Sequence, residues 1–155
     1  MWWRAILLLV ACVSNAQADD DPLKGVQAID VVINVGMDST KCGYNEQEVR
    51  NALLLPIRAY TKIREDEGSA GVPHLLLSML TVNDAGVCIH AIVLELFTFA
   101  FVKLEFAQSP SAHMVQLWRR LKMSVTPVSE SGPTVKRKIE DLGKDFASAW
   151  QKANP

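Results

Sequence analysis

Apolar residues recur along this chain with two spacings, and these spacings predict which segments are strands and which are helices. Alternation of apolar and polar residues predicts a first strand with Ile29, Val31 and Ile33 on one side, continued by Val35 and Met37. The same alternation, together with long apolar runs, predicts three further strands over 73–82, 87–106 and 113–125. The fourth of these strands is expected to turn Val115, Leu117, Leu121, Met123 and Val125 inward.

Two helices are predicted where apolar residues recur every three or four positions. The first follows Asn45, which can cap the helix while Glu48 reaches back to the cap backbone, as in a capping box. Pro56 lies within its apolar face, which ends at Tyr60, and we expect a kink or a weak point there because proline lacks a backbone donor. The second helix is expected to open at Pro133, because proline is favoured at the first helical position.

The order strand, helix, three-stranded meander and helix predicts an α+β fold. We expect a four-stranded, mainly antiparallel sheet with both helices packed on one face, in a single domain over 26–155. A tight turn at 83–86 would join the second and third strands. Pairing Asn83 with Gly86 then places the odd positions of the second strand and the even positions of the third under the helices.

The opposite face of the predicted sheet is too apolar for a surface that only meets water. We expect it to carry six residues of a contact surface, namely Phe97, Phe99, Phe101, Trp118, Arg120 and Lys122. An apolar surface larger than a few hundred Å² on an exported monomer marks an interface. Three explanations stay open: a homo-oligomer or protein partner, a hydrophobic small ligand or lipid, and a misassigned strand.

His74 and Glu95 would lie opposite each other on this outer face, in the same pairing. A carboxylate and a histidine on directly opposite positions of neighbouring strands can act together in proton transfer. The sequence places no nucleophile or second carboxylate beside them. We therefore interpret the pair as a polar contact between strands.

Residues 1–18 have the three parts of a secretory signal peptide. Arg4 supplies the positive charge, 5–13 is an apolar run, and Ala16-Gln17-Ala18 is a cleavage pattern. An alternative is a lipobox ending at Cys12, but only 5–8 would then remain as the apolar run, so we favour simple export. Residues 19–25 would form a flexible acidic leader.

Charge and cysteine content narrow the functional classes. The formal net charge of −1 argues against a nucleic-acid partner, which requires a clustered basic face. The apolar run 87–106 is long enough for a membrane span, yet Glu95 near its middle favours a strand. Cys42 and Cys88 remain after cleavage and are expected to form a disulfide, since Cys42 precedes the first helix and Cys88 faces the side that this helix covers.

No pattern in the sequence predicts chemistry. There is no CxxC pair or Cys/His cluster, so we expect neither a metal nor a redox cofactor, and we find no catalytic motif. His90 alternates onto the covered face and is interpreted as a core histidine. The segment Asp38-Ser39-Thr40 has no histidine at a recognisable spacing and is interpreted as a loop.

The C-terminal segment resembles a group of small exported bacterial proteins of uncharacterised role. The resemblance rests on Ile139-Glu140-Asp141-Leu142, on Asp145-Phe146, and on 150–155, which ends in Ala-Asn-Pro. It implies a signal peptide, a strand, a helix, a meander with a tryptophan and a final amphipathic helix, and it carries no known activity.

From the signal peptide, the apolar outer face and the lack of a catalytic motif, we expect a non-catalytic periplasmic or secreted domain that binds through its outer sheet face. A carrier or sensor of an apolar or amphipathic ligand is the alternative, with Arg120 and Lys122 meeting an anionic head group.

Overall fold

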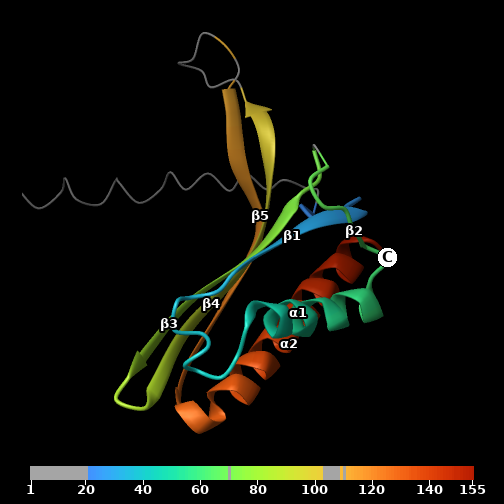
Figure 1. Cartoon of the computed structure of the whole chain (residues 1–155). Coiled ribbons are helices and arrows are strands. Elements are labelled where there is room, and N and C mark those ends of the chain that lie inside the picture. The colour runs from blue at the N-terminus through green and yellow to red at the C-terminus, as the bar shows by residue number, and fades with distance from the viewer. Residues whose placement is uncertain (1–20, 70, 103–108, 110) are drawn as a thin grey trace, which may run out of the picture.

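The computed structural model describes residues 21–69, 71–102, 109 and 111–155. Its elements in chain order are β1 (Ala28–Asn34), α1 (Glu46–Tyr60), β2 (Arg64–Glu65), β3 (His74–Asp84), β4 (Val87–Val102), β5 (Ser111–Pro127) and α2 (Val128–Ala153). Both helices lie on the same side of a single sheet (Figure 1). The predicted α+β class is confirmed. The predicted signal peptide, with Cys12, lies outside the described residues.

The sheet differs from the predicted one in strand number and direction. It has five strands in the order β2-β1-β3-β4-β5. β1 pairs in parallel with β2 and β3, whereas β4 pairs antiparallel with β3 and β5. The prediction of a four-stranded, mainly antiparallel sheet is therefore corrected to a mixed sheet. The direction differs because a helix between two neighbouring strands returns the chain to the end of the sheet where the first strand began, which makes the two strands parallel. The number differs because β2 has only two residues, too few to give a periodic signal in the sequence.

Helix α1 begins as its sequence predicts. The Asn45 side chain accepts a hydrogen bond from the Glu48 backbone N–H at 3.0 Å, and the Glu48 carboxylate accepts one from the Asn45 N–H at 3.0 Å. This reciprocal pair is the expected capping box. The helix continues through Pro56 to Tyr60.

Helix α2 begins five residues before the predicted start at Pro133. Three tertiary contacts hold its first turns: the Val128 N–H donates to the Gly86 carbonyl, Ser131 bonds His90, and Gly132 lies against the backbone of Gly43. These contacts order the segment before the proline, so the preference of proline for the first helical position does not decide the boundary.

The two helices pack closely against each other at Gly143, which is buried. A Cβ atom built there would lie 2.6 Å from the Leu53 carbonyl oxygen and 2.6 Å from Pro56 Cγ. Only a residue without a side chain fits this crossing. Pro56 is therefore part of the helix–helix contact.

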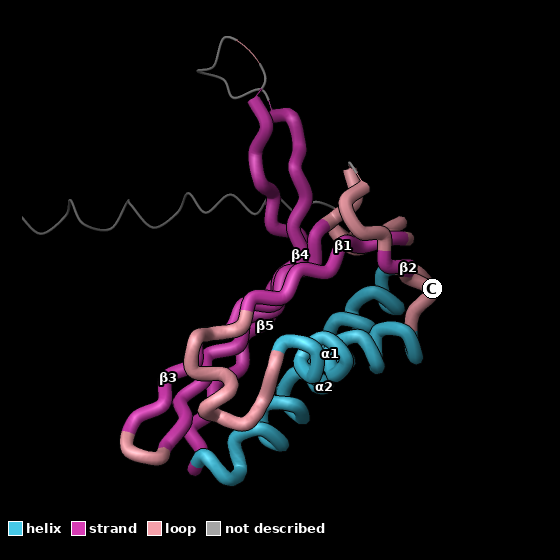
Figure 2. The backbone as a smooth tube through the Cα atoms, viewed as in Figure 1, coloured by secondary structure: helices cyan, strands magenta, loops and turns pink. Residues whose placement is uncertain are grey.

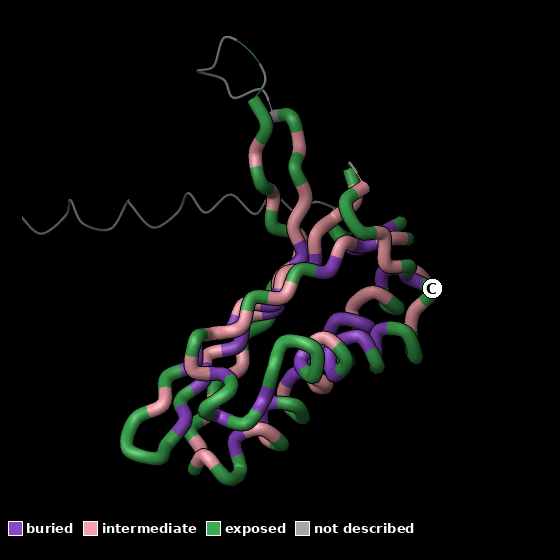
Figure 3. The backbone as a smooth tube through the Cα atoms, viewed as in Figure 1, coloured by how far each residue is buried: buried purple, intermediate pink, exposed green. Residues whose placement is uncertain are grey.

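The hydrophobic core lies between the sheet and the helices. Leu75, Leu77, Ile92 and Leu94 of the sheet are 0 % exposed and pack in one cluster with residues of both helices. In Figure 3 the buried positions recur along the central strands and along both helices. The predicted assignment of odd positions in β3 and even positions in β4 to the covered face is confirmed.

The β3–β4 hairpin is shifted by two residues from the predicted pairing. Asn83 faces Cys88 rather than Gly86, and the two-residue loop is Ala85-Gly86, with φ of 47° and 83°. A shift of two leaves every side chain on its predicted face. It does separate His74 from Glu95, because Phe97 now lies opposite His74 and Leu76 lies opposite Glu95.

The N-terminal segment is anchored at the described positions. Residues 21–25 form a turn with Leu23 buried, and Asn154 donates to the Leu23 carbonyl while its side-chain oxygen accepts from the Gly25 N–H. The predicted flexible leader, 19–25, thus packs on the domain from Asp21 onward, because Leu23 has apolar surface to bury. Within the part of the chain that the structure covers, neither helix is long and apolar enough to cross a bilayer.

Candidate functional site

The uncovered face of the sheet, which we call the outer face, is the candidate site. It consists of the even positions of β3, the odd positions of β4 from Val87 to Phe101, and the β5 residues opposite them. Its exposed large apolar side chains are Leu80, Val82, Val87, Ile89, Phe99, Phe101, Met114, Leu121, Met123 and Val125. No described helix or strand covers this face.

Most of these apolar side chains lie near the β3–β4 hairpin. Seven of the exposed apolar side chains lie there, and each is between 37 % and 68 % exposed: Leu80, Val82, Val87, Ile89, Leu121, Met123 and Val125. At roughly 100 Å² of apolar area for a fully exposed aliphatic side chain, they present about 370 Å² to solvent. An apolar area of this size is in the range of the largest patches that monomers expose, and such patches are often functional.

A second apolar area lies on a ribbon formed by β4 and β5 alone. β3 pairs with β4 only as far as Phe97, so 98–102 and 111–115 continue as two strands beyond the sheet (Figure 2). Phe99, Phe101 and Met114 share the outer face of this ribbon, at 61 %, 82 % and 65 % exposed. Two strands without a covered face are marginally stable alone, so the ribbon gains stability from whatever covers it.

Polar side chains separate the two apolar areas. Glu95 lies opposite Arg119, and neither forms an ion pair with another described residue. On the neighbouring strands His74 Nδ1 lies 3.0 Å from an Asp30 carboxylate oxygen. The His74 ring also stacks on Phe97, with ring centroids 5.2 Å apart. His74 therefore pairs with Asp30, and the expected His74–Glu95 contact does not form.

Phe97, Phe99 and Phe101 lie on the outer face as predicted, but Trp118, Arg120 and Lys122 do not. Trp118 packs against Phe146 of α2, with ring centroids 5.3 Å apart. The Arg120 guanidinium lies 5.4 Å from the Trp118 ring, and Lys122 forms an ion pair with Asp145 of α2 at 3.4 Å. These three residues belong to the helix side of the sheet.

The cause is a β-bulge. The pairing of β4 with β5 shifts between Leu96 and Phe97, so that Leu96 faces Trp118 while Phe97 faces Gln116. The extra residue, Leu117, inverts the alternation of β5 beyond it. The prediction that Leu121, Met123 and Val125 point inward is therefore wrong, and these side chains belong to the outer face. Only the even–odd alternation was readable from the sequence, and a bulge leaves no signal in it.

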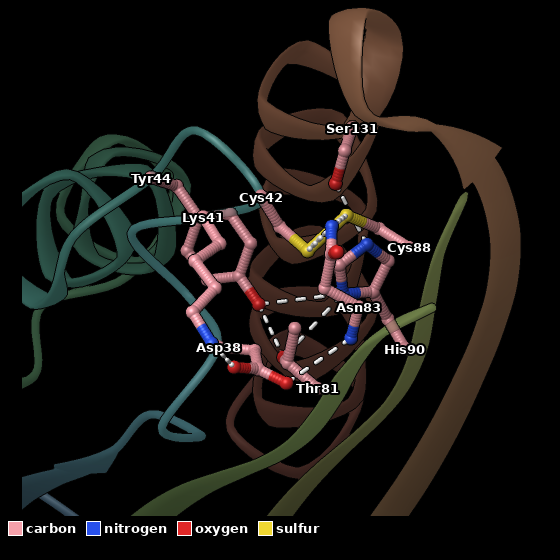
Figure 4. Close-up of a disulfide and its surroundings, with 9 residues drawn as sticks. All are labelled: Asp38, Lys41, Cys42, Tyr44, Thr81, Asn83, Cys88, His90 and Ser131. Atoms are coloured by element: carbon pink, nitrogen blue, oxygen red, sulfur yellow. Dashed lines mark hydrogen bonds and ion pairs between the residues drawn. A yellow bond between two sulfur atoms is a disulfide. The ribbon is translucent and has the colours of Figure 1, made fainter. Parts of the chain in front are cut away.

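A polar cluster lies in the core beside the disulfide (Figure 4). His90 is 0 % exposed, its Nε2 lies 2.8 Å from the Ser131 hydroxyl, and its Nδ1 lies 3.3 Å from the Tyr44 hydroxyl, which also bonds Thr81. Burial lowers the pKa of His90 and raises the pKa of Tyr44, although the bond with Thr81 opposes the second shift. Because the ring is closed to solvent, its chemistry is that of a neutral hydrogen-bonding core residue.

Cys42 and Cys88 form the predicted disulfide, with Cα atoms 6.1 Å apart. Ligand atoms of Cys42, Cys88 and His90 lie within 4.8 Å of one another, which is the spacing of a metal site. The two sulfur atoms are bonded to each other and offer no thiolate to an ion. With the disulfide formed, the cluster links the loop before α1 to β4.

The loop 38–40 is structural in the same way. Asp38 accepts hydrogen bonds from the Lys41 side chain at 2.8 Å and from the Asn83 backbone N–H at 3.1 Å. These two bonds hold the pKa of the Asp38 carboxyl below its ordinary value. The carboxylate thus ties the loop to the end of β3.

Comparison with known proteins adds little to this geometry. No protein-family model and no curated protein sequence matches the chain. Among solved structures, it is similar to a minor lipoprotein from Acinetobacter baumannii, with a TM-score of 0.36 and 7 % sequence identity over 79 % of this chain and 91 % of that one.

Proposed function

We propose that this chain is an exported, non-catalytic binding domain whose contact surface is the outer face of its sheet. The observation that carries the proposal is the contrast between the two faces of one sheet. The inner face is buried under two helices, whereas the outer face exposes side chains of the same apolar types. Covering such a face removes apolar surface from water and favours association.

Export is supported by two independent features. The first eighteen residues have the pattern of a signal peptide. A disulfide such as Cys42–Cys88 is typical of proteins that fold in an oxidising compartment.

A binding role fits the polar groups better than a catalytic one. The His74–Asp30 pair is the arrangement that orients a general base. Its ring packs against Phe97 and Phe99, and no described hydroxyl or thiol bonds its second nitrogen. A half-buried histidine held between a carboxylate and two aromatic rings is suited to recognition at the centre of an interface.

The residues that the carrier alternative requires on one surface lie on two different faces of the sheet. That alternative required the phenylalanines and the cations Arg120 and Lys122 on one surface, to meet the tail and the head group of a ligand. The bulge places those cations on the helix side, across the sheet from Phe99. A protein partner is therefore the better proposal.

Two matched variants test this proposal. Phe99→Asp places a charge on the outer face, and Tyr60→Asp places one at the end of α1, where the aromatic ring is exposed to a similar extent. Both should fold, as judged by circular dichroism, since neither side chain is in the core. In extracts of the producing cell, the wild type and Tyr60→Asp should sediment as a complex and Phe99→Asp as a single chain. Identical sedimentation of all three proteins would contradict the proposal.

A further inference from the structure

We propose that the occupant of the outer face is the outer face of a second copy of this chain. The two copies would be related by a two-fold axis that runs between β4 and β5, parallel to both strands. This inference rests on the proposed function and names its partner. The dimer would have four layers, with the helices outside and the two sheets inside, about 10 Å apart.

The pairing of β4 with β5 makes the face complementary to itself under this axis. The rotation places each outer residue of β4 over the residue of the second copy that corresponds to its own neighbour on β5. Ile89 would meet Val125, Val93 would meet Leu121, and Phe99 would meet Met114. Each of these contacts is apolar on apolar, and each occurs twice.

The charges select this axis over the other in-plane axis. Rotation about the proposed axis brings Glu95 of each copy over Arg119 of the other, because the two residues lie opposite each other on β4 and β5. Neither charge has an ion-pair partner among the described residues. An axis perpendicular to the strands at the same point would set Glu95 over Glu95 and Arg119 over Arg119, and like charges across an interface are unfavourable.

The available surface is sufficient for a stable dimer. Adding Phe99, Phe101 and Met114 of the ribbon contributes about 400 Å², at roughly 200 Å² per fully exposed side chain. The axis leaves β3, with Leu80 and Val82, to one side, and the hairpin-end residues that it covers are Val87, Ile89, Leu121, Met123 and Val125. They add about 270 Å² at roughly 100 Å² for a fully exposed aliphatic side chain. Each copy thus offers about 670 Å² of apolar surface, more than the roughly 520 Å² that is the apolar share of the area a standard homodimer interface buries per partner. The dimer would also cover the ribbon, which the described part of the monomer leaves bare on this side.

Charge reversal tests the axis. Sedimentation equilibrium of the purified wild type should show a dimer, and E95R and R119E should each weaken it at least 100-fold, because each creates two like-charge contacts. An equimolar mixture of E95R and R119E should form a heterodimer, since every acid again faces a base, and the double variant should form a homodimer. K136E, on the exposed side of α2, should dimerise as the wild type does.

Three outcomes overturn the inference: a wild type that stays monomeric, single variants that dimerise unchanged, or a mixture that stays monomeric while circular dichroism shows folded chains. A monomeric purified wild type that still enters a Phe99-dependent complex in cell extract would overturn the dimer and leave the proposed function standing. If that complex is absent as well, both fail.

Discussion

Breaking the Cys42–Cys88 disulfide should remove a large part of the stability of this domain. The bond joins residues 46 positions apart. In the chain-entropy model, a loop of that length restricts the unfolded chain by roughly 4 kcal/mol. A domain of this size is stable by about 5–15 kcal/mol, so the loss is a substantial fraction of the total. The disulfide also links the loop before α1 to the start of β4, next to the hydrogen bond between His90 and Ser131.

Urea unfolding measures this loss in two independent ways. The oxidised chain is compared with the same chain reduced by a phosphine, and with a Cys42→Ala/Cys88→Ala variant. We expect both to lose about 2–4 kcal/mol of unfolding free energy, the variant slightly more because alanine leaves small gaps in the core. A loss below about 1 kcal/mol in both would show that the loop is held by its other contacts, and would refute the reasoning.

Three further substitutions test the packing described above. Gly143→Ala should destabilise by about 1–3 kcal/mol in urea unfolding despite the better helix propensity of alanine, because its Cβ meets the Leu53 carbonyl; a more stable variant would contradict the close crossing. Ala85→Asn should raise the melting temperature, since Ala85 has a positive φ that asparagine tolerates better, and an unchanged or lower value would count against the turn. The folded-state pKa of His90 is lowered, so the unfolded chain binds a proton first as pH falls below about 6.5 and stability falls by up to about 1.4 kcal/mol per pH unit. In His90→Gln this acid-dependent part of the loss between pH 7.5 and 5.5 should disappear, and an unchanged pH dependence would contradict a neutral buried imidazole.

The sequence was sufficient for those parts of the fold that depend on local signals. The capping box of Asn45 and Glu48 follows from two residues three positions apart. The covered face of β3 and β4 follows from alternation, which tolerates a register error of two. The parallel pairing of β1 depends on where α1 returns the chain, and no local pattern records that.

The candidate site shows the same division. Phe97, Phe99 and Phe101 were found because they alternate on one strand. The β5 part of the outer face was assigned to the core, because Leu121, Met123 and Val125 follow a bulge at Leu117. A bulge arises from the pairing of two strands distant in sequence, so its effect on β5 appears only when both strands are in place.

The most direct test of the outer face as the contact surface is a contact map in the cell that produces the protein. A photo-crosslinking residue is placed at Met123 on the outer face or at Leu55 on α1, two apolar positions that are 64 % and 66 % exposed. Equal exposure gives both probes the same access to random encounters, so any difference between them reflects a specific contact. We predict discrete adducts at Met123 and none at Leu55. Equal labelling at both positions, or adducts at Leu55 alone, would contradict the claim that the domain binds through the outer face of its sheet.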